Sequence, residues 1–150
     1  MEIKNYKERL IDKKIDLYLS TFGAILIEDP KWCGKTWTSR YHSNSEFLLS
    51  LPNGNFNNRR IAEIIPDMAL QGEHPRLIDE WQEVPSLWDA VRGKVDSLPA
   101  KGQFILTGSA TINKNRYIHS GTGRIVRLKM RPMTLYESKA SDGNVSLEDI

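Results

Sequence analysis

Three short apolar runs divide the chain into segments of different character. Aliphatic or aromatic residues stand side by side in each of the segments 24–28, 76–80 and 103–107. They do not alternate with polar residues, as they would in a strand with one solvent-exposed face. Continuous runs of this length are typical of strands buried on both faces of a parallel sheet. A fourth run, 125–130, alternates apolar and basic residues and also predicts a strand.

Amphipathic segments lie between these runs and predict helices over residues 6–19, 35–42, 60–65 and 86–98. Ser86 and Asp89 have the spacing of a capping box at the start of the last helix. Residues 46–49 fit either a strand or a short helix. Strands that alternate with helices indicate an α/β layered fold, with a mainly parallel central sheet flanked by helices.

Composition fits one soluble globular domain. The chain has 150 residues, of which 39% are hydrophobic and 27% charged, and this length suits a single core. The net charge of +2 comes from Lys and Arg spread along the sequence, so nucleic-acid binding is not indicated. With a single cysteine, no apolar signal core and no run near the roughly 20 apolar residues of a membrane span, we expect a cytoplasmic protein.

The segment after the first apolar run resembles a phosphate-binding loop. Its sequence, DPKWCGKT at residues 29–36, follows the signature Gly-x-x-x-x-Gly-Lys-Ser/Thr at every position but the first. Gly34 permits close backbone approach to phosphate, Lys35 supplies a positive charge, and Thr36 supplies a hydroxyl for Mg²⁺ at the start of a helix. Further candidates for nucleotide contact are Lys31, Trp32, Cys33 and Trp37.

Asp29 stands where the signature has its first glycine. A carboxylate beside a triphosphate would repel it by on the order of 1 kcal/mol or more. Because Asp29 precedes Pro30, its backbone favours an extended conformation, in which the carboxylate could point away from the loop. The sequence leaves both outcomes open.

Two acids, Asp79 and Glu80, end the second apolar run. A Walker B element has this form: the first acid binds Mg²⁺, largely through water, and the second polarises the water that attacks the γ-phosphate. A solvated acidic strand end is the plainer alternative. Thr107 and Ser109, which end the third run, could sense the phosphate, although a polar turn explains them equally well.

Three late arginines, Arg124, Arg127 and Arg131, are candidates to reach a γ-phosphate in the same or a neighbouring subunit. For Arg127, pairing with a surface acid is the preferred interpretation. The histidines lack metal-ligand spacing, so no zinc site is expected.

Four segments together resemble the N-terminal ATPase core of a bacterial and archaeal family of AAA-type P-loop proteins that carry a C-terminal domain of unknown function. The matching strings are GAILIEDPKWCGKTWTS, PRLIDEWQEVPSLWDAVRGKVD, GQFILTGSAT and HSGTGRIVRLKMRPMTLYES. The resemblance implies an additional-strand P-loop NTPase fold with ATP and Mg²⁺ at the carboxyl edge of the sheet. It assigns phosphate and metal contacts to Lys35 and Thr36, the Walker B pair to Asp79 and Glu80, and sensor candidates to residues 107–109.

The family usually has glycine at the position of Asp29 and continues beyond the position matching Ile150. We therefore expect residues 1–150 to be one P-loop ATPase core from a longer architecture. The leading hypothesis is a magnesium-dependent ATPase that acts on a C-terminal domain or a protein partner, with oligomerisation left open. The alternative is a regulatory module that binds nucleotide weakly or not at all and works through protein or DNA contacts.

Overall fold

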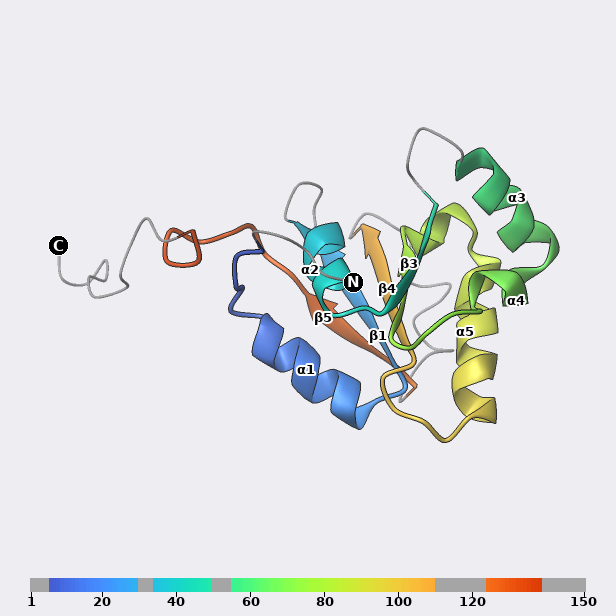
Figure 1. The fold of residues 1–150 in the computed structure, drawn as a ribbon, viewed down its shortest axis with the longest axis horizontal. Coiled ribbons are helices and arrows are strands. Elements are labelled where there is room, and N and C mark those ends of the chain that lie inside the picture. The colour runs from blue at the N-terminus through green and yellow to red at the C-terminus, as the bar shows by residue number, and fades with distance from the viewer. Residues whose placement is uncertain (1–5, 30–33, 50–54, 110–123, 139–150) are drawn as a thin grey trace, which may run out of the picture.

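A computed structural model of the protein describes residues 6–29, 34–49, 55–109 and 124–138. Within them, five strands form one parallel sheet in the order β2-β3-β4-β1-β5 (Figure 1). The strands are β1 (Ala24–Asp29), β2 (Ser45–Leu48), β3 (Arg76–Asp79), β4 (Phe104–Ser109) and β5 (Ile125–Lys129). The α/β fold with a parallel central sheet is confirmed.

The central strands are apolar on both faces because helices cover both. Ala24 and Leu26 of β1 pack into one core cluster, and Ile25 and Ile27 pack into another on the opposite face. One cluster contains side chains from α3 (Asn55–Ile64), α4 (Pro66–Ala69) and α5 (Ser86–Ser97), and the other is covered by α1 (Asp12–Thr21). Figure 1 shows α1 on one side of the sheet and these three helices on the other.

The helix predicted over residues 6–19 begins later, at Asp12. Its early part was predicted wrongly because the Asp12 carboxylate accepts the backbone N–H of Arg9 at 2.7 Å and the hydroxyl of Tyr6 at 2.8 Å. Those bonds hold the preceding segment as a turn. Side chains in that segment lie against α2 (Lys35–Tyr41), where the Tyr6 hydroxyl is also 3.1 Å from Thr38 Oγ1.

Of the other local predictions, some are confirmed and some are wrong. The ambiguous segment at 46–49 is a strand, β2, paired in parallel with β3. The helix α5 starts where predicted, but the expected capping box is wrong, since no side chain caps its first turn. The short helix α4 and the 3-10 turn η1 (Trp81–Glu83) were not predicted.

Candidate functional site

The candidate site lies at the carboxyl edge of the sheet, where β1, β3 and β4 end beside the start of α2. In open α/β sheets, ligands bind outside the carboxyl ends of the strands. The strand β4 lies between β1, which leads into the predicted phosphate loop, and β3, which ends in the acid pair. The polar end of β4 is thereby placed between the two predicted motifs.

Asp79 is the centre of a group of bonded side chains. Its Oδ1 accepts the hydroxyl of Thr36 at 3.1 Å and that of Thr107 at 2.6 Å. The side chain comes from the last residue of β3, and the residue is only 4% exposed. Burial raises the pKa of this carboxyl group and the nearby charge of Glu80 adds to the effect, while the hydrogen bond from Thr107 opposes it. A buried carboxylate with two hydroxyl partners and a cation nearby is typical of a functional site.

Lys35 reaches the same place from α2. Its residue is 6% exposed, and its Nζ donates a hydrogen bond to the carbonyl of Gly108 at 3.0 Å. The structure therefore brings together three predicted elements, namely the lysine and hydroxyl of the loop motif, the first acid of the pair, and the end of β4.

Glu80 adopts an uncommon backbone conformation. Its φ of 59° and ψ of 55° place it in the left-handed region, which is sparsely populated by residues other than glycine. Its N–H donates to Thr107 Oγ1 at 2.9 Å, and its carboxylate accepts the side-chain amide of Gln82. Backbone strain of this kind clusters at active sites. Gln82 was not singled out from the sequence, although its place two residues after the acid pair offered a signal.

Gly108 permits close contact between β4 and the turn that follows the acid pair. A Cβ at this position would lie 2.8 Å from Nε1 of Trp81 and 3.1 Å from Oε1 of Gln82. Real Cβ atoms essentially never approach another atom as closely as 2.8 Å, so a residue other than glycine fits here only if the side chain of Trp81 moves. Trp81 and Trp88 pack in the core, with ring centroids 5.0 Å apart.

The remaining candidates lie apart from this group or outside the described residues. Trp37 is 58% exposed, with the guanidinium of Arg40 5.9 Å from its ring. Arg127 pairs with Glu28 at 3.2 Å, in line with the interpretation of Arg127 as a partner of an acid. Arg124 pairs with Asp96. The side chain of Arg131 is exposed. Ser109 follows Gly108 at the end of β4, where it lies in register with Asp29 at the end of β1. Lys31, Trp32, Cys33 and the side chain of Asp29 lie outside the described part of the structure.

The donor set suits a hard cation that keeps much of its own hydration. The described residues contain no cluster of three or more His, Cys, Asp or Glu side chains that could cage a metal. Thr36 and Asp79 offer one hydroxyl and one carboxylate, close to each other. Mg²⁺ in phosphate-binding sites is typically held by one or two carboxylates together with waters and phosphate oxygens.

Sequence comparison agrees with this geometry. The profile of a protein family described as AAA domain matches residues 21–139. The chain belongs to the AAA domain family. AAA domains are nucleotide-binding domains that generally take ATP with Mg²⁺. No curated protein matches this AAA domain. None of the helices in its described part has the length and apolarity to cross a bilayer.

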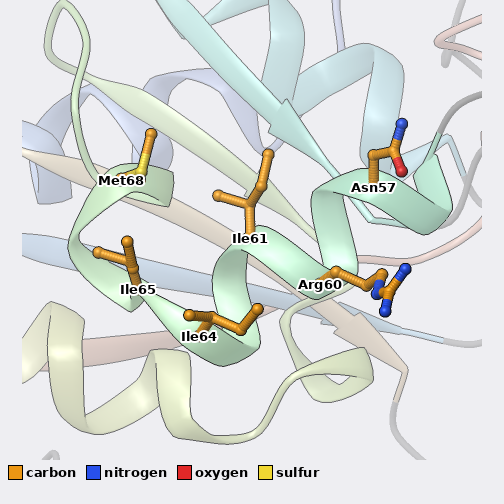
Figure 2. Close-up of a pocket in the computed structure, with 6 residues that line it drawn as sticks. All are labelled: Asn57, Arg60, Ile61, Ile64, Ile65 and Met68. Carbon is orange, nitrogen blue, oxygen red and sulfur yellow. The ribbon is translucent and has the colours of Figure 1, made fainter.

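A hollow of about 340 Å³ at the surface of α3 and α4 is chemically different from the carboxyl-edge site. Its lining consists of Asn57, Arg60, Ile61, Ile64, Ile65 and Met68. Figure 2 shows isoleucine and methionine side chains from both helices around it. With no acid in its lining, this hollow offers no carboxylate for Mg²⁺.

Proposed function

We propose that this AAA domain binds ATP with Mg²⁺ at the carboxyl edge of the sheet and hydrolyses it. The observation that carries the proposal is the meeting of Thr36 with Asp79 at 3.1 Å beside the buried amine of Lys35. These groups come from separate elements, and each has the chemistry that a magnesium triphosphate requires.

In the proposed complex, Lys35 moves from the carbonyl of Gly108 to the β- and γ-phosphate oxygens. This exchange replaces a neutral acceptor with an anionic one, so the attraction between opposite charges adds to the hydrogen bond. Thr36 would ligate Mg²⁺ through its hydroxyl, and Asp79 would hold the metal directly or through water. When bound, Mg²⁺ neutralises charge on the phosphate oxygens.

Glu80 would orient the attacking water. Its carboxylate accepts the amide of Gln82, and its backbone is fixed by the bond to Thr107, which also contacts Asp79. Thr107 therefore connects the two acids, and this connection supports a sensor role for the end of β4. Positioned general bases of this kind contribute about 10²–10⁴-fold to rate.

Phosphate release by the parent protein and Glu80→Gln tests hydrolysis. We expect Glu80→Gln to lower kcat by about 10²-fold or more while leaving nucleotide affinity near the parent value. Glu63→Gln, an exposed change on α3, is the matched control and should retain parental activity. A parent that releases no phosphate at any Mg²⁺ concentration would contradict the ATPase proposal.

Asp29 supports the alternative of a regulatory module with weakened nucleotide binding. Its backbone ends β1, immediately before the loop motif. If the carboxylate faces the phosphates, Asp29→Gly should tighten nucleotide binding by about fivefold, corresponding to roughly 1 kcal/mol. Equal affinities in parent and variant would remove this argument. We also propose that a C-terminal domain or protein partner receives the nucleotide signal, on the strength of the family resemblance alone.

A further inference from the structure

Arg9 is a buried arginine beside the candidate site, and it belongs to neither the phosphate-loop motif nor the acid pair. The residue is 7% exposed. Its Nε lies 3.0 Å from Oε2 of Glu137, a residue 128 positions later, and its Nη2 donates to the backbone carbonyl of Arg131 at 2.7 Å. The guanidinium thus joins the start of the chain to the segment after β5.

The third nitrogen of this group lies close to Gly34 of the loop motif. A Cβ built on Gly34 would lie 3.0 Å from Nη1 of Arg9. Gly34 has a φ of 88°, in the region that favours glycine, and its carbonyl accepts the N–H of Thr38 at 3.0 Å. Arg9 therefore lies against the residue at which the loop motif turns into α2.

Glu137 fixes the guanidinium in place. Its carboxylate also accepts the backbone N–H groups of Leu10 at 2.7 Å and Thr134 at 2.8 Å. Burial alone raises the pKa of Glu137, but the hydrogen bonds from Thr134, Leu10 and Arg9 outweigh it and lower the pKa from 4.5 to about 2. Glu137 is thus a charged anchor at neutral pH.

We propose that Arg9 is a positioning residue for the phosphate site. Held by Glu137 and the carbonyl of Arg131, its guanidinium supports Gly34 and the first turn of α2, and so fixes where Lys35 and Thr36 present their polar atoms. This inference rests on the proposed nucleotide function. A displacement of about 1 Å at a reacting centre can lower the reaction rate by about 10²-fold, so a residue that only holds the site in position can affect catalysis.

Arg9→Lys is the informative variant, because it keeps the positive charge but loses the planar guanidinium, whose three nitrogens lie near Glu137, the carbonyl of Arg131 and Gly34. Arg76→Lys is the matched control: Arg76 is 8% exposed and begins β3, at the opposite edge of the sheet. We expect Arg9→Lys to raise the dissociation constant of a non-hydrolysable ATP analogue about tenfold or more, and Arg76→Lys to leave it within about twofold. Equal effects of the two variants, or no effect of Arg9→Lys, would overturn the proposal.

Amide hydrogen exchange provides a readout that needs no nucleotide. Relative to the amides of β4, the Thr38 amide should exchange about tenfold faster in Arg9→Lys than in the parent, and should be unchanged in Arg76→Lys. If the parent binds no nucleotide, the proposed function fails, yet the exchange comparison still decides the role of Arg9. Equal Thr38 protection in both variants would show that Arg9 does not hold this turn.

Discussion

The two edges of the sheet bury polar side chains to a similar extent but give them different partners. At the carboxyl edge, the carboxylate of Asp79 bonds the hydroxyls of Thr36 and Thr107, while Lys35 bonds a main-chain carbonyl, that of Gly108. At the amino edge, Arg76 Nε donates to the carbonyl of Ala69 at 2.6 Å, and Gln103 Nε2 donates to the carbonyls of Leu98 and Ala100.

This difference distinguishes a site from a structural closure. Bonds to main-chain carbonyls hold loops that precede β3 and β4, and losing them leaves buried acceptors unsatisfied. At the carboxyl edge, the carboxylate of Asp79, its hydroxyl partners and the amine of Lys35 can exchange their present bonds for phosphate and metal without moving the backbone. Variants at the carboxyl edge should therefore change ligand binding more than stability, and variants at the amino edge should do the reverse.

The largest effect is expected for Lys35→Ala. Loss of the ammonium should weaken binding of an ATP analogue by about 100-fold, since hydrogen bonds to charged groups contribute about 1.5–3 kcal/mol. The unfolding free energy should fall by only about 1 kcal/mol, for the lost bond to Gly108. Calorimetric titration and urea unfolding would measure both, with the exposed Lys13→Ala as control. If Lys35→Ala bound the ATP analogue with parental affinity, the carboxyl edge would not be a ligand site that differs from the amino edge.

Arg76→Ala should show the opposite pattern. Removing the guanidinium removes two hydrogen bonds, to the carbonyl of Ala69 and to the hydroxyl of Ser45, and we expect the unfolding free energy to fall by about 2–3 kcal/mol. The nucleotide dissociation constant of the folded variant should stay within about twofold of the parent, because Arg76 lies at the far edge. Urea unfolding and titration on the same sample test this, and a large loss of affinity would contradict the separation of the two edges.

Glu137 sharpens the comparison, because it is a structural anion near the carboxyl edge. Its pKa is lower in the folded protein, about 2, than its ordinary value of 4.5, so its stabilisation is present above pH 4.5 and is lost as pH falls toward 2. Glu137→Gln should cost on the order of 2 kcal/mol at pH 7, with the deficit shrinking between pH 4.5 and about 2. Urea unfolding across this range measures the deficit, and a constant one would show that ionisation is not its cause.

The smallest effect, with opposite sign, is expected for Asp79→Asn. Burial raises the pKa of Asp79, so its ionised form opposes folding, and stability falls as pH rises through the raised pKa. Asparagine retains an oxygen for Thr36 and Thr107 but carries no charge. Asp79→Asn should raise the unfolding free energy at pH 7 by about 1 kcal/mol and abolish the Mg²⁺ dependence of nucleotide binding. A destabilised variant would show that the acid serves the fold.

The sheet and the meeting of the motifs were predictable because they depend on local patterns and one topological rule. Each apolar run became a strand, and the ends of parallel strands meet at one edge, which brings Asp79 to Thr36. The contacts of Arg9 were not predictable, because its partner Glu137 is 128 residues away and neither residue belongs to the phosphate-loop motif or the acid pair. The predicted start of α1 was wrong for a related reason. The Asp12 carboxylate accepts hydrogen bonds from the Tyr6 hydroxyl and the Arg9 N–H, and these bonds compete with helix formation.

The most direct test of the central claim is a crystal structure of the protein with Mg²⁺ and a non-hydrolysable ATP analogue. We predict that the β- and γ-phosphates lie within about 3 Å of Lys35 Nζ, with the metal against Thr36 and facing Asp79. An analogue bound elsewhere, for example in the hollow of α3 and α4, or no analogue at saturating concentration, would contradict the assignment of the carboxyl edge as the nucleotide site.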